Sequence, residues 1–402
     1  MRLTTRSMTT SMPKTLPLDP REVTRTLAPV ERATMLPPRA FADPGVFDWE
    51  LDNIFRGWVC AGHISAVGEP GKFVTRELGG DSVLIIGGSD GTPRAFLNVC
   101  RHRGARIVEQ RQGQVRKRLR CPYHAWSYDL DGELRAAPHM DEVEDFDFPC
   151  WGLLPVRLEV HGGLVLIDLS GQAPEVDEHV GTLLGHLERY RLAELERAAE
   201  ITYDVAANWK GIAENYNECL HCPGVHPELN ALSDYMSGEE VSGEGAWCGG
   251  SMTLREGTTT MAFASNGHSG GRPPIEGLAD TDINNVLYFA LFPNALVSLH
   301  PDYVMLHTLW PQAADRTEVI CEWYFEPRTI ATAQFDPSDA VDFWDTVNKQ
   351  DWYVCELTQK GVRTRGYTAG RYSAEEVDVH AFDLMVAKRY MESLRIDSEV
   401  AV

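Results

Sequence analysis

After Trp58 the chain runs in short segments of alternating apolar and polar residues, separated by Gly, Pro and Asp. This pattern is typical of strands joined by tight turns, and it predicts a small all-β domain. Before it, Phe47, Leu51, Ile54 and Phe55 recur at helical spacing and predict one short amphipathic helix over 48–56. The expected strands cover 73–78, 82–86, 94–99, 153–159 and 164–168.

The second half of the chain mixes strand patterns with longer helical ones. Strands followed by a long helix predict an α+β domain, in which a curved antiparallel sheet is wrapped around a long C-terminal helix as in helix-grip folds. The polar stretch 237–274 predicts a mobile loop over a pocket, because strands resume after it. The expected helices are 181–200, 207–221, 337–361 and 374–395, and the expected strands are 286–299, 303–311 and 317–326.

A length of 402 residues favours two domains over one. We expect an N-terminal segment and leading helix over 1–56, the all-β domain over 57–168 and the α+β domain over 169–402. The formal net charge of −22 argues against binding to nucleic acid or to an anionic membrane. The apolar runs are also too short to cross a bilayer.

Nine cysteines, an odd number, are spread along the chain. The segment Met1–Pro20 lacks the apolar stretch of a secretory signal, although Met8 and Met12 leave the true start open. Together these features predict a reducing, cytoplasmic location and argue against a disulfide framework. Clustered Cys and His residues are therefore first considered as metal ligands.

The first such cluster pairs Cys100-x-His102 with Cys121-x-x-His124. Two sulfur and two nitrogen ligands suit either tetrahedral zinc or an iron–sulfur cluster. The segment between Asn98 and Cys121 also holds eight basic residues and one acid, Glu109, a local charge of +7. Such a segment could steer an acidic electron donor, although a solvated face or contact with an acidic neighbouring subunit explains it equally well.

The second cluster lies in Glu214-Asn-Tyr-Asn-Glu218-Cys-Leu-His221-Cys-Pro-Gly-Val-His226-Pro. Glu214, Glu218 and His221 are spaced for one face of a helix. Pro223-Gly224 then ends that helix, so that His226 can turn back beside His221. A zinc site made from Cys219, Cys222 and His226 is the competing interpretation.

Both clusters together resemble the large subunit of Rieske non-haem iron oxygenases. Asn98-Val-Cys-Arg-His-Arg-Gly-Ala105 and Cys121-Pro-Tyr-His-Ala-Trp-Ser-Tyr128 resemble the two loops that hold a Rieske [2Fe–2S] cluster. The resemblance implies that Cys100 and Cys121 bind one iron and that His102 and His124 bind the other. Ala125 departs from the family, which usually has Gly at this position.

The run from Asn208-Trp-Lys to His226-Pro227 resembles the catalytic motif of the same family. There, two histidines and one carboxylate hold a single Fe(II) that activates O₂. The resemblance assigns His221 and His226 to this iron, with Asp351 as the carboxylate. The fallback carboxylates are Asp342, Asp345 and Glu356.

The family also implies the electron path. An NAD(P)H-dependent flavin/iron–sulfur reductase supplies electrons to the cluster, and each cluster serves the iron of its neighbour in a head-to-tail homotrimer. The catalytic bridge between them is an acid bonded to one histidine of each site. Here that acid is Glu218, which would join His221 to His124 of the neighbouring subunit.

Glu218 stands where ring-dihydroxylating members usually carry Asp. Together with Leu299-His-Pro-Asp-Tyr303, it resembles the branch that hydroxylates an N-methyl group of glycine betaine, choline or carnitine and releases formaldehyde. A quaternary ammonium group is bound by aromatic rings through cation–π attraction. The expected pocket residues are Tyr203, Tyr288, Phe289 and Trp323. The alternatives are an aromatic-ring hydroxylating oxygenase and a non-enzymatic redox or zinc protein.

Overall fold

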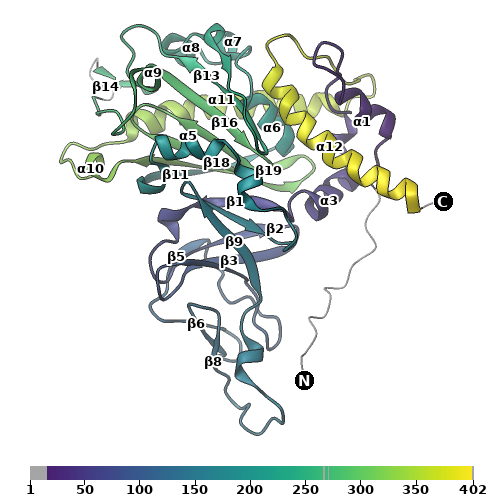
Figure 1. The fold of residues 1–402 in the computed structure, drawn as a ribbon, viewed down its shortest axis with the longest axis vertical. Helices are drawn as coiled ribbons and strands as arrows, with labels where there is room; N and C mark the ends of the chain where they lie inside the picture. The colour runs from purple at the N-terminus through teal and green to yellow at the C-terminus, as the bar shows by residue number, and fades with distance from the viewer. Residues whose placement is uncertain (1–15, 266–267, 270, 401–402) are drawn as a thin grey trace.

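The computed structural model describes residues 16–265, 268–269 and 271–400. It contains two seven-stranded antiparallel sheets, which follow each other along the long axis of the molecule (Figure 1). The expectations for the start of the chain fall on residues 1–15 and lie outside the described residues. None of the described helices is both long enough and apolar enough to cross a membrane.

The first sheet has the strand order β1-β10-β9-β4-β3-β2-β5, and it confirms the all-β prediction. The five expected strands agree with the observed ones to within two residues at either end, so the apolar segments and their turn residues were a sufficient signal. The bounds are β1 Trp58–His63, β2 Lys72–Leu78, β3 Asp81–Gly87, β4 Pro93–Leu97, β5 Gln112–Gln114, β9 Pro155–His161 and β10 Leu164–Asp168.

A small three-stranded sheet extends from the first one at the lower end of the molecule (Figure 1). It consists of β6 Arg118–Arg120, β7 Ser127–Asp129 and β8 Leu134–Ala136. The apolar core that it shares with one face of the first sheet includes Trp126, Tyr128 and both cysteines of the first Cys/His cluster. This packing fixes the position of the loops that carry those cysteines.

The second sheet has the order β11-β19-β18-β17-β16-β13-β12 and confirms the predicted curved antiparallel sheet. The predicted strand over 286–299 is two strands, joined by a tight turn at 292–294. The predicted loop 237–274 also supplies strands to this sheet. The bounds are β11 Glu196–Val205, β12 Glu239–Glu240, β13 Trp247–Thr253, β16 Asn285–Leu291, β17 Ala295–Leu299, β18 Val304–Ala313 and β19 Arg316–Phe325.

The loop that follows β13 is held by a buried arginine. Arg272 donates to Asp302 (2.9 Å) and to Asp339 (2.6 Å), and all three side chains are less than a tenth exposed. This loop also contains the strand pair β14 Ala264–Ser265 and β15 His268–Ser269.

Two long helices complete the second half, as predicted. Helix α11 (Ser338–Val362) contacts α6 and β11, and α12 (Val377–Val400) contacts α6, β13 and α1. The predicted helix over 181–200 is wrong beyond residue 195, because 196–205 forms the edge strand β11 paired with β19. The remaining α-helices of the described residues are α1 Pro20–Thr26, α2 Arg39–Ala42, α3 Pro44–Asn53, α4 Val176–Val180, α5 Leu183–Arg189, α6 Trp209–Tyr216, α7 Cys222–Val225, α8 Pro227–Leu232, α9 Asp280–Ile283 and α10 Pro327–Ile330.

Polar contacts between the two sheets fix the halves relative to each other. The buried Asn294 side chain accepts from Cys60 N (2.8 Å) and donates to Cys60 O (3.0 Å), which extends the edge of β1. Arg111 donates through both terminal nitrogens to Glu318 (2.8 Å each).

Candidate metal sites

The two Cys/His segments of the first cluster form loops with the same backbone turn. In each loop the cysteine N–H donates to the carbonyl five residues later, and the cysteine carbonyl accepts from the N–H four residues later. The repeated turn brings two equivalent pairs of side chains together. The bonds are Cys100 N to Ala105 O (2.8 Å), Gly104 N to Cys100 O (3.0 Å), Cys121 N to Trp126 O (2.8 Å) and Ala125 N to Cys121 O (3.2 Å).

The thiols and the imidazoles of these loops have different surroundings. Cys100 and Cys121 are each 2% exposed, and the Tyr128 hydroxyl lies 3.4 Å from Cys100 Sγ. His102 and His124 are more exposed, with ring centroids 4.6 Å apart. Two buried sulfurs beside two outer imidazoles are the donor set of a Rieske [2Fe–2S] cluster, so these residues fit that group.

The backbone at Ala125 is strained, because its φ of 60° lies in the left-handed region. We expect Ala125→Gly to stabilise the loop by about 0.5–1 kcal/mol, since relief of strain is partly offset by the greater chain entropy of Gly. The measurement is the urea concentration at which the holoprotein loses its cluster absorbance.

Gly104 offers a matched control, because it holds the same turn position in the other loop with a φ of +74°. A Cβ there would meet nothing within 4 Å, so Gly104→Ala tests backbone strain alone. We expect Gly104→Ala to shift the urea midpoint down and Ala125→Gly to shift it up. An unchanged midpoint in both variants would contradict the strain argument.

The basic segment Asn98–Cys121 divides into paired and unpaired cations. Arg106 pairs with Glu77 (2.9 Å), and Arg111 pairs with Glu318 across the two sheets. Four exposed cations on and before β6 have no ion pair within the described part of the chain. They are Arg116, Lys117, Arg118 and Arg120.

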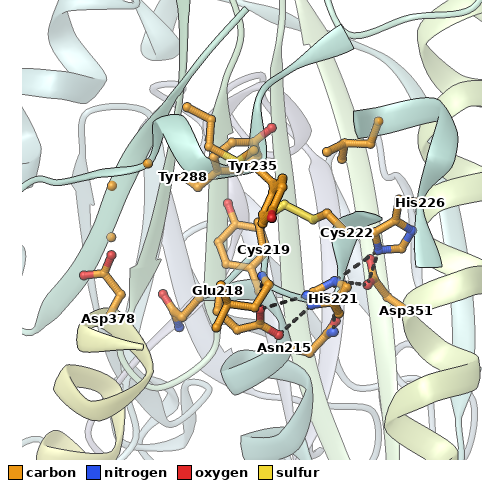
Figure 2. A pocket seen from close by; sticks show the side chains of 18 of the residues that line it. Asn215, Glu218, Cys219, His221, Cys222, His226, Tyr235, Tyr288, Asp351 and Asp378 are labelled. Atoms are coloured by element: carbon orange, nitrogen blue, oxygen red, sulfur yellow. Dashed lines mark hydrogen bonds and ion pairs between the residues drawn. A yellow bond between two sulfur atoms is a disulfide. The ribbon is translucent and has the colours of Figure 1, made fainter. Parts of the chain in front are cut away.

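The second cluster brings together His221, His226 and Asp351, although the acid lies 125 or more residues from the histidines along the chain (Figure 2). The two Nε2 atoms are 3.1 Å apart. Asp351 Oδ1 lies 3.2 Å from His221 Nε2 and 2.8 Å from His226 Nε2. Three ligand atoms therefore converge on one point.

These separations fit a mononuclear iron. Ligands at right angles around a first-row metal with bonds of about 2.1 Å are about 3.0 Å apart. The three observed distances match three adjacent corners of an octahedron, which is the 2-His-1-carboxylate arrangement that leaves the opposite corners open. The donor set and the spacing thus agree with the group that the sequence predicted.

The hydrogen bonds of the outer ring nitrogens orient both histidines. His221 Nδ1 lies 2.5 Å from Glu218 Oε1, and His226 Nδ1 lies 2.7 Å from Gln350 Oε1. An acceptor at Nδ1 fixes the proton there and leaves Nε2 free as a ligand. Sequence reasoning identified Glu218 but missed Gln350, although it directly precedes Asp351 on α11.

The negative charges of Asp351 and Glu218 make the triad a favourable place for a cation. Burial raises the pKa of Asp351, but hydrogen bonds from the two histidines outweigh it and hold that pKa below its usual value. Burial lowers the pKa of His221, but hydrogen bonds to Asp351 and Glu218 outweigh it and raise that pKa to about 9. A metal ion competes with this proton at Nε2, so binding releases protons.

The local fold differs from the predicted helix over 207–221. Helix α6 ends at Tyr216, so Glu218 and His221 lie in the turn that follows, and Glu214 faces the buried Asp383 instead. A disulfide joins Cys219 to Cys222, which the cysteine count did not predict, while the other seven cysteines, all within the described residues, form no disulfide. The thiolates of a zinc site are therefore engaged in another bond, although Cys222 Sγ is within 4.8 Å of both imidazoles.

The three fallback carboxylates make other contacts. Asp345 accepts from Tyr203 (3.0 Å) and from Lys349 (2.5 Å), and Glu356 accepts from the backbone of Ala206 (3.2 Å). Asp342 is exposed. Asp351 alone among the four acids faces the histidines.

A cavity of about 200 Å³ reaches this triad (Figure 2). Of the four expected pocket residues, Tyr288 lines it and the other three do not. Phe289 follows Tyr288 on β16, so its ring points to the opposite face of the sheet. Trp323 is fully buried on β19, and Tyr203 lies behind the cavity against Trp352. The aromatic lining residues are Tyr216, Tyr235, Tyr288, Trp344 and Trp352.

Comparison with known protein families agrees with both sites. The family described as "Rieske [2Fe-2S] domain" matches residues 57–147. The family described as "Ring hydroxylating alpha subunit (catalytic domain)" matches residues 192–392. The first match contains both Cys/His loops, and the second contains the histidine pair and Asp351.

Individual relatives cover most of the chain. It is 30% identical over 367 residues to the glycine betaine monooxygenase oxygenase subunit of Pseudomonas aeruginosa, covering 84% of each. It is 29% identical over 354 residues to the carnitine monooxygenase oxygenase subunit of Escherichia coli, covering 86% of this chain and 89% of the relative. The crystal structure of the quaternary ammonium Rieske monooxygenase CntA with L-carnitine has the same fold, with a TM-score of 0.76, 24% identity and coverage of 93% and 99%.

Proposed function

Because the chain belongs to the ring-hydroxylating oxygenase alpha subunits that carry a Rieske domain, we propose that it hydroxylates an N-methyl group of a quaternary ammonium compound. In this reaction O₂, two electrons and two protons convert one N–CH₃ into N–CH₂OH and release water. The C–N bond of that product then breaks, which gives a tertiary amine, formaldehyde and a proton. When bound, the [2Fe–2S] cluster and the mononuclear iron supply electron transfer and O₂ activation.

The observation that carries this proposal is an aromatic corner in the cavity that reaches the triad. Tyr288 lies edge to face with Tyr216 (centroids 5.9 Å apart) and with Trp344 (6.4 Å). Burial raises the pKa of Tyr288 and of Tyr216, so both phenols stay neutral. Ring faces without a charge of their own attract an alkylammonium group and hold it next to the triad.

We assign the iron to His221, His226 and Asp351, and the cluster to Cys100, His102, Cys121 and His124. Within one chain these two sites lie at opposite ends of the long axis, near α7 and near β6 (Figure 1). This arrangement supports a head-to-tail homotrimer, in which Glu218 joins His221 to His124 of the neighbouring subunit. The cationic surface formed by residues 116–120 lies on the cluster domain and suits an acidic, NAD(P)H-dependent flavin/iron–sulfur reductase.

The function is tested by formaldehyde release from the iron-loaded chain with O₂, NADH and a flavin–ferredoxin reductase. Choline, glycine betaine, carnitine and stachydrine are the test substrates. Formaldehyde from any of them, in an amount equal to the tertiary amine formed, supports the proposal. Hydroxylation of an aromatic substrate without formaldehyde from the quaternary amines would instead favour the ring-hydroxylating alternative.

Glu218→Gln is expected to lower kcat by about 10–100-fold, because the partner of a ligand histidine tunes its basicity. The amide keeps an acceptor for His221 Nδ1 but loses the charge that strengthens the bond. Iron content, cluster absorbance and the rate of single-turnover cluster oxidation are measured together.

The matched control is Glu356→Gln on α11, which also removes one negative charge. Glu356 accepts a hydrogen bond from Ala206 N and does not face the histidines. We expect this control to keep the kcat of the parent chain. A Glu218→Gln variant with unchanged kcat and unchanged cluster oxidation would exclude Glu218 from the electron path.

A further inference from the structure

The cavity that reaches the triad is anionic. Its described lining includes no Lys or Arg, while it holds six carboxylates. The third histidine that lines it, His307, is neutral at pH 7, because burial lowers its pKa to about 4. The six acids are Glu218, Glu239, Glu240, Asp351, Glu375 and Asp378.

The bound iron would not neutralise this charge. The two positive charges of Fe(II) are balanced by Asp351 and Glu218, which contact the ligand histidines. The other four carboxylates have no ion pair with any Arg or Lys in the described parts of the chain. Three of them, Glu239, Glu240 and Glu375, are exposed at the mouth, and Asp378 is half-buried.

Asp378 lies on the side of the cavity opposite Asp351 (Figure 2). It stands in the first turn of α12 and packs against Gly250 of β13. A Cβ on Gly250 would lie 3.3 Å from Asp378 Oδ2 and 2.6 Å from Glu239 O, so glycine permits this close approach. Burial and the negative charge of Glu240 raise the pKa of Asp378 to about 6, which leaves it mostly ionised at neutral pH.

Three residues that line the cavity each carry a polar atom with no hydrogen-bond partner among the described residues. The Tyr288 hydroxyl, the Trp352 indole N–H and His307 Nδ1 are buried and have no hydrogen bond to the described residues. Trp352 is 9% exposed and His307 2% exposed. Buried polar groups are normally hydrogen-bonded, so these three atoms are exceptions in the wall of the cavity.

We propose that Asp378 determines substrate specificity by selecting the charge at the end of the quaternary ammonium compound that is remote from the iron. This inference rests on the proposed function. The aromatic corner holds the trimethylammonium group near the triad, and the remote end faces Asp378 and the acids of the mouth. A neutral hydroxyl or a second cation is accepted there, whereas a carboxylate meets like charges with no cation to pair with it.

Choline and glycine betaine form a matched pair for the test, because they share the trimethylammonium group and differ in a hydroxymethyl against a carboxylate. We expect the chain to favour choline at least tenfold in kcat/KM, and to bind choline more tightly in calorimetry on the oxygen-free holoprotein. Asp378→Asn is expected to reduce kcat/KM for choline about tenfold and to narrow the ratio between the two substrates. Asp378→Lys is expected to shift the preference towards glycine betaine.

Glu256→Gln is the control, since Glu256 is exposed and lies outside the cavity lining. It changes the net charge of the chain by the same amount as Asp378→Asn. It should leave the ratio of kcat/KM for choline to that for glycine betaine unchanged. Cluster absorbance and iron content show whether each variant is folded.

The outcomes separate this inference from the proposed function. Formaldehyde from glycine betaine in preference to choline would overturn the charge selection and leave the function intact. A choline preference that Asp378→Asn does not alter would overturn the assignment to Asp378. If no compound yields formaldehyde, the proposed function fails. The ratio of the affinities for choline and glycine betaine, measured by calorimetry, still decides whether the cavity selects for charge.

Discussion

The Asp351→Ala variant is expected to keep its Rieske cluster and to lose both bound Fe(II) and turnover. Asp351 supplies the only carboxylate oxygen within 3.2 Å of both ligand nitrogens in the described residues. Loss of a hydrogen-bond partner of a ligand already costs about 10–100-fold, so removal of a ligand itself should lower turnover by more than about 100-fold. Iron per chain, measured by metal analysis, should fall from three atoms to the two of the cluster.

Asp345→Ala is the matched control, because Asp345 is also an acid on α11 but accepts from Tyr203 and Lys349. It should keep all three iron atoms. If Asp351→Ala retained the third iron and Asp345→Ala lost it, the ligand assignment would be wrong. Zinc in place of iron in the parent chain would instead favour the non-enzymatic zinc alternative.

The parts of both sites that sequence analysis predicted are those fixed by short segments. The spacing of Cys100, His102, Cys121 and His124 sets their geometry through two equal turns. His221 and His226 are also close in sequence. Pro223-Gly224 does not end the preceding helix as expected, because α6 already ends at Tyr216 and Pro223-Gly224 lies within the short helix α7. The short spacing of these residues along the chain was therefore sufficient to predict most of both sites.

The predictions that failed depend on distant contacts. Residues 196–200 read Glu-Arg-Ala-Ala-Glu and favour a helix, but pairing with β19 makes them a strand, so tertiary contacts override propensity. Tyr288 and Phe289 are adjacent aromatic residues, and only the register of β16 decides which ring faces the cavity. The role of Asp378 could not be predicted from its neighbours in the sequence. The carboxylates of β12 that lie near it are far from α12 along the chain.

The Asn-Trp-Lys start of the catalytic motif has a structural role that the sequence did not reveal. Asn208 caps α6 through a bond from Lys210 N (3.0 Å). Trp209 donates to Glu50 Oε2 (2.9 Å) and Lys210 donates to Glu50 Oε1 (2.6 Å), and the Tyr390 hydroxyl also donates to Glu50. The helix that leads to the histidines is thus tied to α3 and α12.

Lys210→Met is expected to destabilise the catalytic domain by about 3–5 kcal/mol, because it leaves the fully buried Glu50 charge without its cation. Burial lowers the pKa of Lys210, and the nearby Glu50 carboxylate partly offsets this effect. For a domain of this size the loss corresponds to a fall in the melting midpoint of roughly 6–20 °C. The midpoint is followed by far-UV circular dichroism, separately from the loss of cluster absorbance.

The double variant Lys210→Met with Glu50→Gln decides whether charge is the cause. Removing both charges should recover much of the loss, since neutral replacements of a buried ion pair are often well tolerated. The amide oxygen that Glu50→Gln introduces would still accept from Trp209 or Tyr390. If the double variant melts at or below the Lys210→Met midpoint, the pairing with Glu50 is not the cause. Lost packing of the Lys210 stem, or lost cation–π contacts of its Nζ with the Phe41 and Trp209 rings (5.5 and 4.9 Å to the centroids), accounts for the effect instead.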